Sequence, residues 1–112
     1  MNEKTKKYLL DALNSVESID SFIDEEMDFE GYQKDKLRRR AVERELEIIG
    51  EAINHALKVE PTLVISDARN IVGLRNWLIH AYDSVDDALV WNVIKKYLPN
   101  LKKELAALLS ES

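Results

Sequence analysis

The sequence predicts an all-α protein, an antiparallel bundle of four or five helices that forms a single domain over residues 1–112. Three observations predict this class. The chain has only three glycines and two prolines, it has no alternating β-branched runs, and its apolar residues recur every three or four positions. With 46% hydrophobic and 33% charged residues, it has the composition of a globular chain with one hydrophobic core.

The first helix is predicted over residues 3–24. Its apolar residues fall on one face at helical spacing: Leu9, Leu13, Val16, Ile19 and Ile23. The acidic segment DEEMDFEGY follows. We expect this segment to end the helix, with residues 24–30 forming either a solvated loop or a contact for a basic partner surface.

The second helix is predicted over about 33–57, before Pro61 ends the segment. Its inner stripe consists of Val42, Leu46, Ile49, Ile53 and Leu57. Gly50 lies in the middle of this helix, where glycine costs about 1 kcal/mol relative to alanine. That cost indicates that a neighbouring helix packs closely against Gly50.

The third helix is expected to begin near Ser66, a suitable N-cap residue, and to run to about Ile79. The last helix is expected to begin near Ser84, with Asp86 and Asp87 in its first turn, where carboxylates interact favourably with the helix dipole. Pro99 either kinks this helix or begins a new segment.

Composition excludes several classes of function. The chain has no cysteine, so disulfides, thiol chemistry and cysteine-ligated zinc are ruled out. No apolar run is long enough to span a bilayer, and the N-terminus lacks a signal-peptide pattern, so we expect a cytoplasmic protein without a membrane partner. The net charge is −5, whereas a general nucleic-acid coat would be basic, so any RNA contact must be a focused site.

The segment GLRNWLIHAYDSV at 73–85 concentrates side chains that can carry chemistry. Arg75 and His80 are five residues apart, which on an ideal helix separates them by about 140°. They can converge only if the helix ends before His80, or if a second chain brings its copy across. The turn-prone residues of HAYDS favour a helix end.

The spacing Arg75-x4-His80-x-Tyr82 resembles the signature of the HepT-type toxins of the HEPN superfamily. The surrounding sequence agrees, because AVERELEIIGEA at 41–52 and VWNVIKKYLPNL at 90–101 resemble two helices of that family. The resemblance covers about 37–105. It implies a HEPN-like helical homodimer, a metal-independent endoribonuclease without a cofactor, and a partner nucleotidyltransferase antitoxin of the MNT type.

The resemblance also implies roles for individual residues. Arg75 and His80 match the catalytic pair, and Tyr82 matches the tyrosine to which the antitoxin attaches AMP. Asn76 is given a supporting role, either orienting a phosphate or capping the helix end. An imidazole can act as general acid or base, and a guanidinium can hold phosphate oxygens with two donors. A homodimer would supply a second histidine.

Other motifs have two readings each. Arg38, Arg39 and Arg40 are candidate RNA-binding residues, or else a solvated face paired with nearby glutamates. Glu47, Glu51 and His55 resemble a metal-ligand stripe, but the spacing does not match di-iron bundles, so no metal is expected.

Trp77 and Trp91 are expected in the core or a dimer contact. The alternative to the nuclease is a non-catalytic HEPN subunit that binds a nucleotide or scaffolds the nucleotidyltransferase. Its distinguishing feature would be Arg75 and His80 buried with internal partners.

Overall fold

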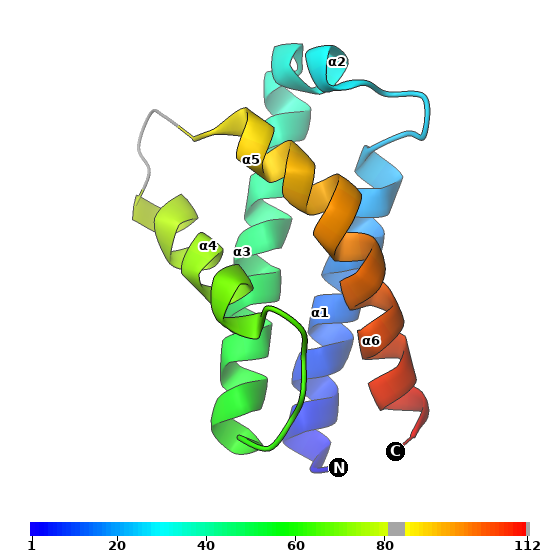
Figure 1. Ribbon diagram of the computed structural model, residues 1–112, viewed down its shortest axis with the longest axis vertical. Coiled ribbons are helices and arrows are strands. Elements are labelled where there is room, and N and C mark those ends of the chain that lie inside the picture. The colour runs from blue at the N-terminus through cyan, green and yellow to red at the C-terminus, as the bar shows by residue number, and fades with distance from the viewer. Residues whose placement is uncertain (81–84, 112) are drawn as a thin grey trace.

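The computed structural model describes residues 1–80 and 85–111. Within them the chain forms four long helical segments that alternate in direction, with one short helix at a connection (Figure 1). The expected all-α antiparallel bundle is therefore confirmed. The elements are α1 (Glu3–Phe22), α2 (Phe29–Lys34), α3 (Lys36–Val59), α4 (Ala68–His80), α5 (Asp87–Asn92), the π-helical turn η1 (Val93–Tyr97) and α6 (Leu98–Ser110).

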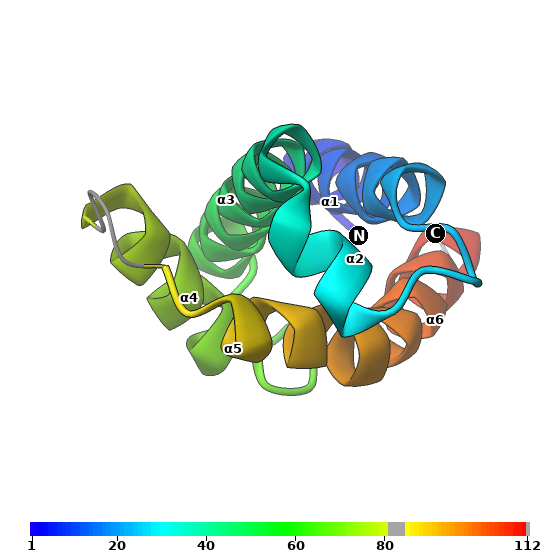
Figure 2. The same cartoon turned by 90° about the horizontal axis from the view of Figure 1, so that it is seen from above.

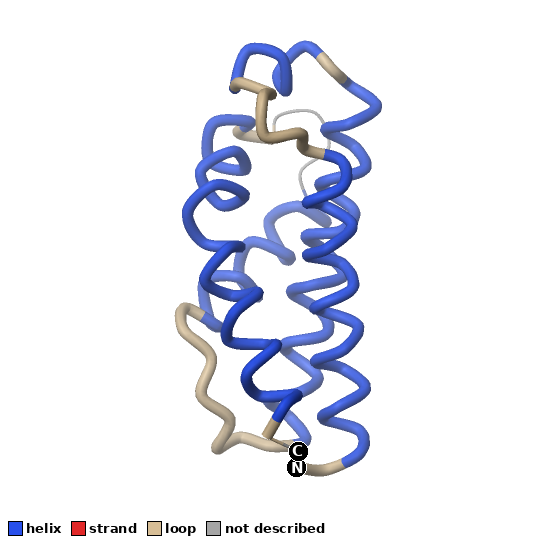
Figure 3. Tube along the Cα trace, turned by 90° about the vertical axis from the view of Figure 1, so that its right-hand side faces the viewer, coloured by secondary structure: helices blue, strands red, loops and turns tan. Residues whose placement is uncertain are grey.

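The start of α1 and the end of α6 lie at the same end of the bundle (Figure 3). Asn2 caps α1, because its side chain accepts a hydrogen bond from the Lys4 amide at 2.7 Å. The predicted apolar face is buried at Leu9, Val16 and Ile19. The prediction for this helix is confirmed to within two residues at its C-terminal end.

The acidic segment is not only loop, because it contains α2. Asp28 caps this short helix by accepting from the Gly31 amide at 2.8 Å. Tyr32 is completely buried, with its ring 5.3 Å from that of Trp91. Asp35 ends α2 and caps α3, so the predicted second helix is divided at that residue. The expectation of a continuous loop was wrong because a capped helix that buries a large aromatic ring is more stable than an open acidic segment.

Ser66 is not the N-cap of α4. Its hydroxyl donates to Glu104 Oε2 at 2.9 Å, and its amide donates to the same oxygen at 3.1 Å. The next residue, Asp67, has a left-handed φ of 56° and offers its carbonyl to the amides of Asn70 and Ile71. Ser66 is therefore used to bind α6, and α4 begins at Ala68.

The last helical run begins later than predicted. Asp86 caps α5 by accepting from the Leu89 amide at 3.1 Å, so the cap is not Ser84, which lies outside the described residues. The run continues through η1 into α6 and changes direction on the way (Figure 1). The Leu98 amide donates to the Val93 carbonyl, one residue further back than in an α-helix, just before Pro99. The wide turn accommodates a residue that has no amide hydrogen and would clash with an α-helical carbonyl.

The core lies where α3 packs between α1 and α4 and where α6 packs on α1 (Figure 2). The largest fully buried side chains come from α1, α2, α3, α5 and α6: Tyr32, Leu9, Ile19, Leu46, Ile49, Ile53, Leu98, Leu101, Leu105, Val16, Val42 and Val90. In the described part of the chain, no helix combines the length and apolar character required to cross a membrane.

Candidate functional site

Arg75 lies at a close contact between α3 and α4. A Cβ atom added to Gly50 would overlap the Arg75 Cβ and lie 2.9 Å from the Ile71 carbonyl oxygen. The prediction that a helix packs closely on Gly50 is confirmed, and that helix is α4. The stem of Arg75 is therefore held against the α3 backbone, which restricts where its guanidinium group can lie.

The Arg75 guanidinium has no carboxylate partner among the described residues. Its Nη1 donates to Asn76 Oδ1 at 2.8 Å, while its Nε is buried without a hydrogen-bond partner there. Arg75 itself is half-buried. A guanidinium that is positioned but not neutralised can bind a phosphate without first breaking an ion pair.

His80 is exposed and is the last residue of α4. The expectation that the helix ends before His80 was wrong, since α4 includes both Arg75 and His80. Regular helical geometry then separates the two side chains by about 140° around the axis and about 7.5 Å along it. Of the two routes by which the pair could converge, only the one through a second chain remains. Tyr82 lies outside the described residues.

The arginine triplet is largely occupied by ion pairs. Arg38 lies 3.3 Å from Asp35, and Arg39 lies 3.9 Å from Asp87 at the start of α5. Arg40 is exposed. The structure thus gives Arg38 and Arg39 structural partners, as in the second of the two readings.

Arg39 belongs to a polar cluster between α2, α3 and α5. Arg39 Nε, Asp87 Oδ1 and the Tyr32 hydroxyl are all buried, and each lacks a hydrogen-bond partner among the described residues. Burial raises the pKa of Glu43, and the nearby Asp87 carboxylate raises it further, against the opposing effect of Arg40 and Arg39. Burial also raises the pKa of Tyr32.

The residues of the possible metal stripe form pairs along α3. Glu47 lies 3.2 Å from Arg44, and Glu51 lies 3.7 Å from His55. The His55 ring also stacks on Tyr8, with a centroid distance of 5.2 Å. The described residues contain no group of three or more His, Cys, Asp or Glu side chains arranged to hold a metal ion.

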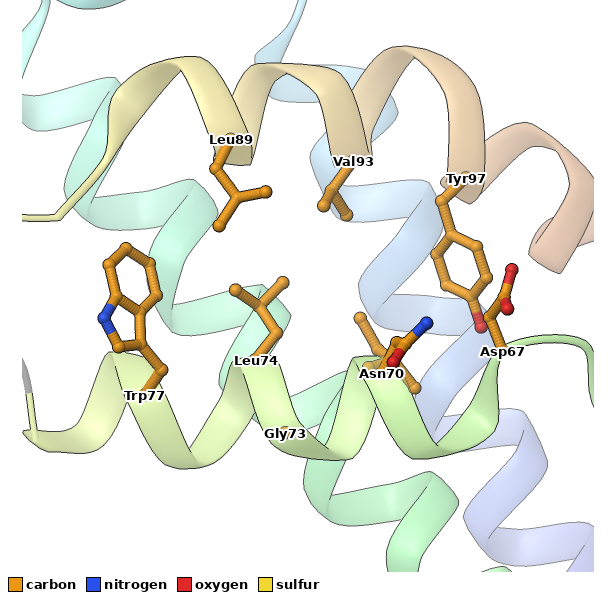
Figure 4. A pocket seen from close by; sticks show the side chains of 9 residues that line it. Asp67, Asn70, Gly73, Leu74, Trp77, Leu89, Val93 and Tyr97 are labelled. Carbon is orange, nitrogen blue, oxygen red and sulfur yellow. The ribbon is translucent and has the colours of Figure 1, made fainter.

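An open groove of about 450 Å³ separates α4 from α5 and η1 (Figure 4). Leu74 and Trp77 rise from α4, and Leu89 and Val93 face them from the other wall. At one end the Tyr97 hydroxyl donates to the Ser66 carbonyl at 2.7 Å. The sequence did not predict this groove, although apolar residues recur at helical spacing in both segments. The pattern of one helix does not show which other helix covers it.

The two tryptophans have different surroundings. Both are partly buried against the core, which agrees with the prediction. Trp91 also contacts Phe29 with ring centroids 6.2 Å apart, and Lys95 Nζ lies 4.8 Å from its ring centroid. Trp77 instead lines the groove, three residues before His80.

Comparison with known proteins gives a consistent result. The family model described as "Ribonuclease HepT-like" matches residues 12–108. The chain is 38% identical over 103 residues to "Putative RNase MJ1380" of Methanocaldococcus jannaschii, covering 89% of this chain and 92% of that protein. It is 37% identical over 106 residues to "Probable ribonuclease HepT" of Thermococcus cleftensis, covering 91% and 93%. No solved structure matches the chain.

Proposed function

Since this chain belongs to the ribonuclease HepT-like family, we propose that it is an endoribonuclease toxin in which Arg75 and His80 carry the reaction. The observation that carries this proposal is the state of the two side chains. His80 is exposed, and the Arg75 guanidinium has no carboxylate partner in the described part of the chain. The alternative, a non-catalytic subunit, would predict both residues buried with internal partners, so the exposure of His80 and the lack of a carboxylate beside Arg75 in the described residues favour the nuclease.

The chemistry needs no metal, because RNA carries its own nucleophile. The 2′-oxygen attacks the adjacent phosphorus as a base removes its proton, and the bond to the 5′-oxygen breaks as an acid donates a proton to it. His80 supplies the proton-transfer group, and Arg75 stabilises the negative charge that develops on the phosphate oxygens. The products are a 2′,3′-cyclic phosphate and a 5′-hydroxyl.

Two proton transfers and the geometry of α4 both call for a homodimer. One chain offers one His80, and the helix turns it away from its own Arg75. The apolar walls of the groove, Leu74 and Trp77 on α4 with Leu89 and Val93 opposite, are the surface proposed for the second copy, because the groove is open and Leu89 is exposed. Burying such a surface stabilises association, provided that the contact reaches the area typical of stable interfaces.

The proposed activity is tested with purified protein and single-stranded RNA in excess EDTA. We expect cleavage to continue and to leave 2′,3′-cyclic phosphate ends. Cleavage that EDTA abolishes and Mg²⁺ restores, or products with 5′-phosphates, would contradict the mechanism.

Tyr82 is proposed as the residue that a partner nucleotidyltransferase silences by attaching AMP. A phosphodiester there would add about one negative charge beside the Arg75 site and weaken RNA binding. Incubation with the cognate nucleotidyltransferase and ATP should add an AMP-sized mass to the wild type but not to Tyr82→Phe, measured by intact-mass spectrometry. Tyr8→Phe is the matched control and should still be modified. An adduct that persists on Tyr82→Phe would rule out this assignment.

A further inference from the structure

The exposed face of α4 carries a row of side chains that extends beyond the candidate catalytic pair. Arg69, Gly73, Asn76 and His80 follow one another at helical spacing, and all four are exposed. At 100° per residue, Arg69, Asn76 and His80 lie within about 40° of one another around the helix axis. The row therefore begins at His80 and runs along α4 towards its first turn.

Helix α4 is locally basic in a chain that is acidic overall. The protein has 21 acidic residues and a net charge of −5, yet the sequence of α4, ARNIVGLRNWLIH, contains two arginines and no carboxylate. The nearest carboxylate along the chain, Asp67, lies on the groove. A polyanion that approaches this acidic protein along α4 meets two arginines and no carboxylate of the helix itself.

The guanidinium group of Arg69 is free to bind a ligand on this surface. Arg38, Arg39 and Arg44 each lie within 4 Å of a carboxylate. The Arg69 side chain, by contrast, takes part in no hydrogen bond or ion pair within residues 1–80 and 85–111. An exposed guanidinium without a partner offers its full set of donors to a ligand.

Gly73 leaves the space between Arg69 and Asn76 open. A Cβ atom added at Gly73 would have no neighbour within 4 Å among residues 1–80 and 85–111, so packing in this part of the chain does not require glycine there. Glycine there costs about 1 kcal/mol of helix stability relative to alanine. The absence of a side chain gives a ligand lying along the row direct access to the helix backbone.

We propose that Arg69 binds a backbone phosphate of the RNA about 16 Å along α4 from His80, so that the substrate strand lies over Gly73. This inference rests on the proposed ribonuclease function and names the path of its substrate. Two features favour the phosphodiester strand as the ligand. Its phosphates repeat along the strand, so one can reach Arg69 while another lies at His80. The guanidinium group can also donate two parallel hydrogen bonds to the oxygens of one phosphate. Arg69 also lies in the first turn of α4, where the helix dipole favours an anion.

The test compares Arg69→Ala with Arg44→Ala, which removes the same charge from an exposed arginine of α3 that is paired with Glu47. Substrates are single-stranded RNAs of graded length, from a dinucleotide upwards. For long RNA, Arg69→Ala should raise KM and Kd about five- to tenfold with unchanged kcat, and should reduce the salt dependence of binding by about one phosphate contact. The dinucleotide should be cleaved as by wild type, and Arg69→Lys should recover part of the loss.

The outcomes separate this inference from the proposed function. Equal behaviour of Arg69→Ala and Arg44→Ala on long RNA, or an equal loss on the dinucleotide, would overturn the role of Arg69 while leaving the nuclease intact. If the wild type binds long RNA but does not cleave it, the nuclease fails and the binding comparison still decides the role of Arg69. If the wild type does not bind RNA, both proposals fall. An Arg69→Ala effect seen only on binding to an acidic partner protein would replace the RNA path with a protein contact.

Discussion

At the scale of single residues, two helical glycines show how much depends on what lies beside them. Gly50 touches the stem of Arg75, whereas Gly73 has open space around it. Both positions carry the same intrinsic cost in a helix. Only the first is required by packing within the chain, and it connects the fold directly to a candidate catalytic side chain.

The two glycine substitutions should therefore have opposite effects on stability. Gly50→Ala inserts a methyl group into the α3–α4 contact and should lower the free energy of unfolding by about 1–3 kcal/mol. It should also reduce RNA cleavage, because Arg75 must move. Gly73→Ala should raise the free energy of unfolding by up to about 1 kcal/mol. Urea titrations of both variants measure this, and equal destabilisation would show that the two environments are not as different as described.

Residue types, spacing and the family resemblance were enough to propose Arg75, Asn76 and His80 as candidates, but not to predict their mutual geometry. Whether His80 is the last residue of α4 or the first of a turn changes its direction completely. The start of α4 is likewise set by contacts with distant residues, such as Ser66 with Glu104, which do not appear in a local pattern.

At the scale of elements, the apolar stripes of α1 and α3 were predictable because each repeats over many turns. The short helix α2 and the turn η1 were not. Helix α2 depends on a pocket for Tyr32 beside Trp91, and η1 depends on how α5 and α6 pack around Pro99. The groove was missed for the same reason, because helical patterns do not specify which helices lie side by side.

The cluster that joins α3 to α5 should make stability depend on pH. Because the folded-state pKa of Glu43 is raised above 4.5, Glu43 supports the fold only while it is protonated. Its contribution is complete below the unfolded pKa and is lost as the pH rises through the folded pKa. Glu43→Gln should therefore unfold at a higher urea concentration than wild type at pH 7, and this difference should shrink towards pH 4.

Glu45→Gln, two positions away on α3, is the control for removal of a carboxylate. If Glu43→Gln were less stable than wild type at pH 7, the attraction of Glu43 to Arg40 and Arg39 would outweigh its burial, and the sign derived above would be wrong. Circular dichroism across the urea series is sufficient for this comparison.

At the scale of the whole molecule, the groove leaves apolar side chains exposed to solvent in the single chain. Leu89 is 44% exposed although it faces an apolar wall. Leu89→Asp should keep the chain folded but convert a dimer into a monomer, measured by sedimentation at tens of micromolar. Leu37→Asp is the matched control, because Leu37 is 82% exposed at the start of α3 and should leave the dimer unchanged. If Leu89→Asp is still a dimer, the interface lies elsewhere. If the wild type is a monomer, the proposed homodimer is wrong.

The central claim is that His80 carries proton transfer in RNA cleavage, and the chain contains its own control. It has two histidines, and the other, His55, stacks on Tyr8 and pairs with Glu51 on α3. The most direct measurement is the rate of RNA cleavage by His80→Ala and His55→Ala, each confirmed as folded. We expect His80→Ala to lose about two orders of magnitude or more and His55→Ala to retain the wild-type rate. Full activity in His80→Ala, or an equal loss in both variants, would contradict the claim.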